Sequence, residues 1–164
     1  MTLNYVSSIC LGVDPGSLAC GWAVVSRLNS TKMELIDSGT IVSNRGTGFD
    51  KRILGIHTKL TEVINQYAPN FMAVESPFVE KNAATAIKLG QIRGGILLTA
   101  GLHGLSVGNY NPMQVKKAVS GYGWADKNQV SKMVMLILNL KTALPNDAAD
   151  AAAVAISHLL STRR

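Results

Sequence analysis

The sequence has few acidic residues, few aromatic residues and only two cysteines. Asp and Glu number 10 against 16 Lys and Arg, and aromatic residues make up 5% of the chain. No apolar run approaches the roughly 18 residues that a membrane-spanning helix needs, and no basic segment precedes the first apolar stretch, as it would in a secretory signal. Cys10 and Cys20 have no second metal-type pair, so we expect free, buried thiols in a reducing cytosol.

The residues that are present favour a globular protein with an anionic partner. A hydrophobic content of 47% with 16% charged residues is typical of a folded chain, and 164 residues predict a single domain spanning residues 1–164. The formal charge of +6 favours a polyanion. Many basic proteins of this size bind nothing anionic, so the charge alone leaves nucleic acid undecided.

Hydrophobic periodicity predicts an α/β layout. Short apolar runs predict three antiparallel strands, which are followed by helix, strand, helix, strand and then further helices. This order favours a five-stranded mixed sheet, with three antiparallel strands leading into two parallel ones and helices on both faces. The expected strands cover residues 6–13, 21–27, 33–42, 71–74 and 105–110, and the expected helices cover 49–67, 83–103, 112–120, 127–139 and a segment after Pro145.

Four of the scarce acids stand at the ends of predicted elements. Asp14 follows the first strand and Glu75 the fourth, so both emerge at one sheet edge if those strands are parallel neighbours. Asp147 and Asp150 share a face of the last helix's first turn. Four converging carboxylates repel one another and favour a divalent cation. Each acid taken singly also fits a structural role, because Asp-Pro-Gly is a common turn and Asp is favoured at a helix start.

Four segments resemble RuvC-type Holliday junction resolvases, in register from about Ile9 to His158. They read LGVDPGSLACGWAVV, FMAVESPFVEKNAATAIKLGQIRGG, NPMQVKKAVSGYGWADKNQV and NDAADAAAVAISH. The resemblance implies an RNase H-like fold and an endonuclease that makes paired nicks in two opposing strands of a four-way DNA junction during recombination and repair. It also implies a homodimer, a branch-migration helicase complex as partner, and a cytoplasmic, nucleoid-associated location.

The resemblance also assigns roles to individual residues. It implies that Asp14, Glu75, Asp147 and Asp150 are catalytic and bind Mg²⁺ or Mn²⁺, with two ions in each active site, and that Gly16 lets a phosphate approach closely. Phe78 would stack at the branch point. Lys116 and Lys127 would lie near the scissile phosphate, and a wider phosphate-binding field would include Lys81, Lys88, Arg93 and Lys117.

Other functions remain as alternatives at this point. A junction-binding relative without activity would lack one or more of the acids, whereas all four are present. An actin-like nucleotide hydrolase needs two lobes to enclose ATP, and this chain supplies one. An RNase H-like nuclease that cuts RNA–DNA hybrids would share the acids, so only a comparison of substrates separates it from a resolvase.

One further expectation concerns the helix predicted over 83–103. Its apolar surface is broader than one sheet-facing stripe needs, and its glycines allow another helix to approach closely. Two symmetrical cuts need two active sites related by a two-fold axis. We therefore expect an isologous dimer joined mainly through this helix, which a charge at Ile87 or Leu98, whichever faces the partner, would disrupt.

Overall fold

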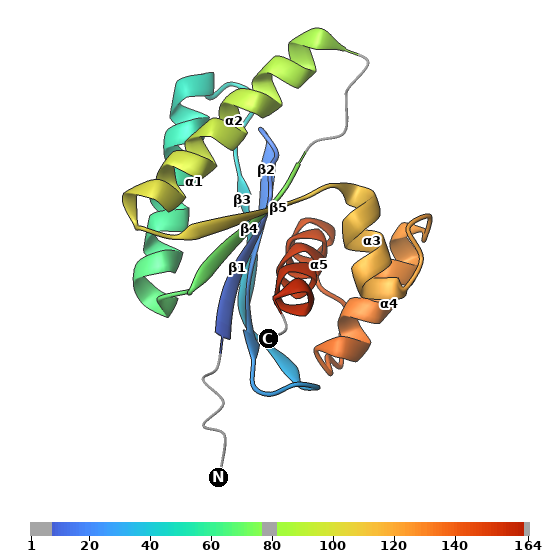
Figure 1. The fold of residues 1–164 in the computed structure, drawn as a ribbon. Helices are drawn as coiled ribbons and strands as arrows, with labels where there is room; N and C mark the ends of the chain where they lie inside the picture. Colours follow the sequence, from blue (N-terminus) through green and yellow to red (C-terminus); the bar gives the residue numbers. More distant parts are fainter. Residues whose placement is uncertain (1–7, 77–81, 163–164) are drawn as a thin grey trace.

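The computed structural model describes residues 8–76 and 82–162. Its sheet has the strand order β3-β2-β1-β4-β5, with α1 and α2 on one face and α3, α4 and α5 on the other (Figure 1). The strands are β1 (Ser8–Asp14), β2 (Ala19–Arg27), β3 (Met33–Val42), β4 (Phe71–Glu75) and β5 (Ser106–Tyr110). The helices are α1 (Phe49–Tyr67), α2 (Ala83–Leu102), α3 (Pro112–Ser120), α4 (Lys127–Ile137) and α5 (Asn146–Ser161).

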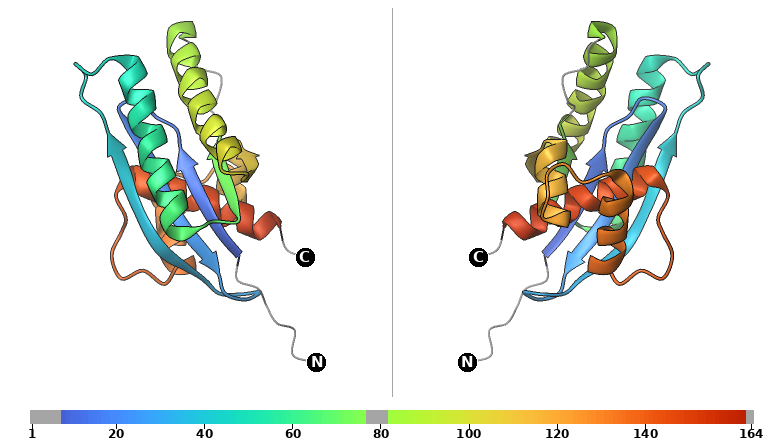
Figure 2. Two further views of the ribbon diagram at one scale, coloured as in Figure 1. Left: turned by 90° about the vertical axis from the view of Figure 1, so that its left-hand side faces the viewer. Right: turned by 90° about the vertical axis from the view of Figure 1, so that its right-hand side faces the viewer.

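The sheet is mixed, as the sequence predicts. β1, β2 and β3 pair antiparallel, whereas β1 pairs with β4, and β4 with β5, in parallel. The right-angle views in Figure 2 show the helical layers on opposite sides of this sheet. Val13 of β1 lies beside Val74 of β4. Both strands therefore end at the same level, and the residue that follows each valine emerges at one edge of the sheet.

The two faces of the central strands differ in side-chain size. Successive residues of a strand point to opposite faces. In β1, Leu11 and Val13 pack with α1 and α2, while Cys10 belongs to the core under α5. In β4, Met72 and Val74 face the first core, and the smaller Ala73 faces the second. Small residues on the α5 side let that helix lie close to the sheet.

Capping residues fix the helices next to this sheet edge. Asn111 precedes Pro112 and forms a reciprocal capping box with Gln114 at the start of α3. Asp126 does the same with Gln129 at the start of α4, and the three-residue spacing of this pair in the sequence itself predicts such a cap. The predicted fourth helix runs two residues too far, because α4 ends at Ile137 and Asn139 has a left-handed backbone with φ 52°.

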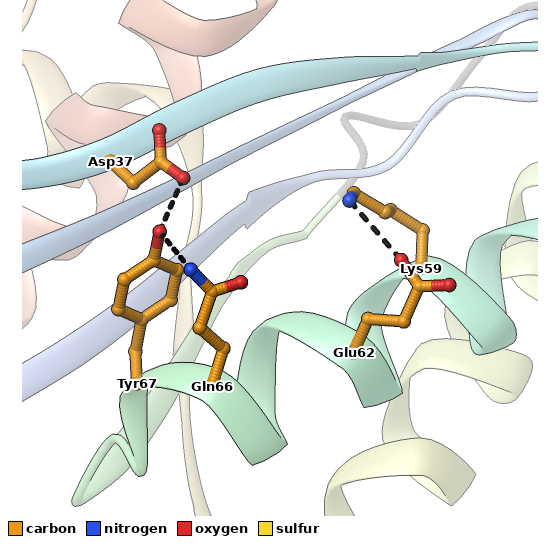
Figure 3. Close-up of polar contacts among 5 residues, drawn as sticks. All are labelled: Asp37, Lys59, Glu62, Gln66 and Tyr67. Carbon is orange, nitrogen blue, oxygen red and sulfur yellow. Dashed lines mark hydrogen bonds and ion pairs between the residues drawn. The ribbon is translucent and has the colours of Figure 1, made fainter.

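Side-chain hydrogen bonds fix the end of α1 against the sheet edge formed by β3 (Figure 3). The Tyr67 hydroxyl donates to Asp37 Oδ2 at 2.6 Å and accepts from Gln66 Nε2 at 2.9 Å. On the same helix, Lys59 and Glu62 form an exposed ion pair at 3.2 Å. Tyr67, which the helical periodicity places on the apolar face of α1, thus packs its ring and keeps its hydroxyl bonded.

Other expectations from composition can be compared with the structure directly. Cys10 and Cys20 are free and buried, as predicted. They belong to different cores, on opposite faces of the sheet. Among the residues that the structure describes, no helix is long and apolar enough to cross a membrane.

Candidate active site

Asp14 and Glu75 lie next to each other at the ends of the two central parallel strands. Each follows a buried valine, Val13 in β1 and Val74 in β4, and these valines are register partners. A side-chain hydrogen bond joins the Asp14 and Glu75 carboxyl groups. The predicted convergence of these two acids at one sheet edge is confirmed.

Two glycines bring the acids of α5 to the same edge. A Cβ atom on Gly21 would lie 2.0 Å from the Asp147 carbonyl oxygen, and one on Gly12 would lie 2.1 Å from the Ala151 carbonyl oxygen. The α5 backbone therefore rests directly on β1 and β2. Gly21 is also the register partner of Asp14. This close packing places Asp147 and Asp150, in the first turns of α5, near Asp14.

A cleft of about 410 Å³ opens at this edge of the sheet. Three of the acids line it, namely Asp14, Glu75 and Asp150. Lys116 and Lys127, which the family resemblance places near the scissile phosphate, line it as well. The lysine Lys127 donates to Asp150 Oδ2 at 2.9 Å. Apolar residues complete the lining: Pro112, Val115, Val130 and Ala153. The cleft thus combines carboxylates with cations, as a phosphodiester-binding site would.

Burial and neighbouring charges shift the pKa values of Asp14 and Glu75. Burial, followed by the neighbouring Glu75 carboxylate and then by Asp150 and Asp147, raises the pKa of Asp14 to about 8. Burial also raises the pKa of Glu75, while Lys127 and Lys116 oppose that shift. With its pKa raised, the Asp14 carboxyl keeps its proton to higher pH than an exposed aspartate and donates a hydrogen bond to Glu75. A cation bound among these oxygens would favour the ionised carboxylate and so lower the pKa of Asp14.

The donor set fits a hard divalent cation better than any other group. Carboxylate oxygens are the ligands that Mg²⁺ prefers. The pKa of Asp14 is raised first by burial and then by the neighbouring carboxylates, whose charge a cation would offset. In the described segments, however, no three His, Cys, Asp or Glu side chains are already arranged to hold a metal ion. Asp150 is paired with the Lys127 ammonium instead, so metal binding requires side-chain movement at this pair.

The predicted DNA-binding residues divide into three groups. Lys116 and Lys127 line the cleft. Lys117 lines a separate hollow with Tyr110, Arg93 of α2 donates to Asn109 on β5, and Lys88 is exposed on α2, so the structure does not bring these three into the lining of the cleft. Phe78 and Lys81 lie outside the described residues.

Gly16 and His158 have structural roles in this fold. A Cβ on Gly16 would lie 2.0 Å from the Ala19 carbonyl oxygen, so the turn itself requires glycine there. His158, which the sequence does not place among the site residues, is buried, and its Nδ1 lies 3.0 Å from the Tyr110 hydroxyl. It lies on α5, where its ring packs against Phe71 of β4 and Tyr110 of β5 and does not line the cleft.

The residues that position α5 were not identified from the sequence. Gly12 and Gly21 carry no chemistry, yet they determine where Asp147 and Asp150 lie. The signal was present as a match of small residues, with two strand glycines opposite the alanine-rich start of α5. It could be read only once the packing of that helix on β1 and β2 was known.

Comparisons with known proteins agree with this geometry. The family model described as "Crossover junction endodeoxyribonuclease RuvC" matches residues 10–158. The crossover junction endodeoxyribonuclease RuvC of Caldicellulosiruptor saccharolyticus is 40% identical over 153 residues, which cover 93% of this chain and 92% of that protein. Its counterpart in Citrifermentans bemidjiense is 44% identical over 150 residues, covering 92% and 91%. The solved structure of T. thermophilus RuvC in complex with Holliday junction substrate superimposes with a TM-score of 0.91 at 34% identity and covers 95% of both chains.

Proposed function

The chain belongs to the RuvC family of crossover junction endodeoxyribonucleases, and on that premise we propose that its four clustered acids cut the DNA. The protein is a nuclease that resolves Holliday junctions. The observation that supports the assignment of the site is the convergence of Asp14, Glu75 and Asp150 in one cleft with Lys116 and Lys127. Asp147 contributes to the same electrostatic cluster.

We infer that Mg²⁺ is the cofactor and that two ions are held by Asp14, Glu75, Asp147 and Asp150. When bound, a pair of such ions activates a water molecule and stabilises the leaving oxygen of a phosphodiester. The chain's own part is to bring the acids together, to exclude bulk water with Val115 and Val130, and to present Lys116 and Lys127 to phosphate oxygens. Ion binding and proton loss from Asp14 are linked, because the same oxygens take part in both.

We propose that the protein acts as an isologous dimer through α2. Ile87 and Leu98 are each 63% exposed, and they lie eleven residues apart, about three helical turns, on one face of α2. Gly90 and Gly94 lie along the same stripe, and a Cβ added to either would meet nothing within 4 Å. An apolar stripe with this much free space fits a second copy of the helix.

A branch-migration helicase complex and a nucleoid-associated location follow as proposals from the junction substrate. A protein that cuts at a mobile branch point needs that point delivered to it. Co-purification of the protein with such a helicase on a synthetic junction would test this association. Failure to form any joint complex on the junction would argue against it.

A substrate panel tests the proposed function. Purified protein is mixed with a mobile four-way junction, linear duplex of the same sequence and an RNA–DNA hybrid, each with Mg²⁺ or with EDTA. We expect paired nicks at symmetrical positions in the junction with Mg²⁺ alone. Preferential cutting of the hybrid would support the other RNase H-like nuclease activity, and cutting in EDTA would contradict the metal-dependent site.

A further inference from the structure

Trp124 is a large aromatic side chain that the fold leaves in solvent. It is 72% exposed, whereas the chain's other tryptophan, Trp22, is 6% exposed. Burying a tryptophan removes about 150–250 Å² of surface from water. The folded chain does not gain this burial at Trp124, so the indole surface is available to a ligand.

The loop that carries Trp124 is fixed at both ends. Gly121 closes α3 in a left-handed conformation, with φ 80°, and its N–H donates to the Lys117 carbonyl at 2.9 Å. After Trp124, Ala125 is 2% exposed and anchors the chain in the core. Asp126 then caps α4 by accepting from the Gln129 N–H at 2.9 Å. A side chain on such a short, anchored loop is preorganised, so little conformational entropy is lost when it binds.

This loop joins α3 and α4, and both helices contribute residues to the lining of the active-site cleft. A Cβ on Gly123 would lie 3.5 Å from the Met113 carbonyl oxygen. Pro112, which precedes Met113 in the chain, lines the cleft. On the other side, Lys127 follows Trp124 by three residues and contacts Asp150 at 2.9 Å. The Cα atoms of Trp124 and Lys127 are therefore at most about 11 Å apart.

The positive charge around the loop favours an anionic partner such as DNA over a basic or a purely apolar one. Residues 112–140 contain four lysines and a single acid, Asp126, whose carboxylate is engaged in capping α4. Two of these lysines, Lys116 and Lys127, line the cleft where a phosphodiester must lie. Proteins that bind single-stranded or distorted DNA combine an exposed aromatic ring with nearby cations: the cations bind the phosphates, and a base stacks on the ring.

We propose that the Trp124 indole stacks on a base of the junction close to the scissile phosphate, as an aromatic DNA contact additional to the four acids. The proposal rests on the proposed function, because it takes the cleft as the cutting site. Tyr122, 61% exposed on the same loop, lines a different hollow with Lys132 and Leu136. It therefore provides a matched control.

The first test is junction binding in EDTA, where no strand is cut. Stacking on one base corresponds to about a 5- to 150-fold change in affinity. Trp124→Ala should weaken binding of a four-way junction by that factor, Trp124→Phe should retain most of the affinity, and Tyr122→Ala should bind as the wild type does. Unchanged affinity of a folded Trp124→Ala protein would overturn the proposal and leave the indole as a contact for another protein.

The second test uses tryptophan fluorescence, since the chain has only two tryptophans. In a Trp22→Phe protein, the emission of Trp124 should be quenched as junction is added and should saturate with binding. If that variant does not fold, the difference between wild type and Trp124→Phe isolates the same signal. Emission that does not change at saturating junction would overturn the proposal.

The outcomes also separate this inference from the proposed function. If Trp124 behaves as expected in EDTA but Asp147→Asn still cuts in Mg²⁺, the stacking contact stands and the assignment of the acids fails. If the acids are required for cutting but Trp124→Ala binds normally, the assignment of the acids stands and the stacking contact fails.

Discussion

Replacing Asp14 with asparagine should stabilise the metal-free protein at neutral pH. The ordinary pKa of the Asp14 carboxyl is 3.8, and burial with its acidic neighbours raises it to about 8 in the folded state. Between these values the folded state holds a proton that the unfolded state has lost. The stability that this bound proton contributes is therefore fully present below about pH 4 and is lost as the pH rises toward 8. The asparagine side chain carries no titrating proton, and its amide can still donate to Glu75.

The size of the effect follows from the width of this window. Each pH unit changes the free energy of unfolding by at most about 1.4 kcal/mol, so the step from pH 5 to pH 7 costs at most about 2.7 kcal/mol. Because the carboxyl shares its proton with Glu75 and keeps some contact with water, we expect about 1–2 kcal/mol. For a chain of this size that corresponds to a melting temperature difference of about 2–8 °C.

The assay is thermal or urea unfolding in EDTA at pH 5 and pH 7. Wild type should lose more stability between the two pH values than Asp14→Asn. Glu34→Gln, which removes an exposed acid on β3, should follow the wild type. Equal pH dependence in wild type and Asp14→Asn, or a clear loss of stability on substitution at pH 7, would refute the account of the buried acid pair.

Three further predictions concern packing, assembly and the edge of the sheet. Gly21→Ala should lower the free energy of unfolding by about 1–3 kcal/mol and reduce cleavage by about 100-fold, because the added methyl group would meet the Asp147 carbonyl oxygen. The control is Gly46→Ala, whose added methyl group would have nothing within 4 Å. Equal stability and activity of the two variants would argue against tight packing of α5 on the sheet. Leu98→Glu should sediment as a monomer and lose paired nicking, whereas Leu136→Glu, 72% exposed on α4, should stay dimeric; dimers in both would remove α2 from the interface. Tyr67→Phe should lower the free energy of unfolding by about 1 kcal/mol without changing cleavage, and an unchanged urea midpoint would show that its bond to Asp37 contributes nothing.

The acids at the strand ends could be predicted because strand geometry is simple. Adjacent parallel strands that end at the same level present their next residues together, and Asp14 and Glu75 obey that rule. The start of α4 was equally predictable, since Asp126 with Gln129 is a capping signal that depends on local chemistry alone. These features require no knowledge of which elements pack together.

The direction of single side chains on helices could not be predicted in the same way. Lys116 and Lys117 are adjacent and point about 100° apart on α3, so only one of them can face a given cleft. The first lines the cleft and the second lines another hollow. Which one does so depends on how α3 packs on α5, and that packing is set by residues far apart in the sequence. The same limit applies to the close contact of Gly21 with Asp147.

The most direct test of the central claim is the cleavage of a synthetic mobile junction by Asp147→Asn in Mg²⁺ buffer, with products mapped at nucleotide resolution and junction binding measured in parallel. The account predicts at least about a 100-fold loss of nicking, with binding intact or tighter because one negative charge has left the DNA-facing cluster. Glu34→Gln should cut as the wild type does. Substantial paired nicking by a well-folded Asp147→Asn protein would contradict the claim that these acids form the catalytic centre.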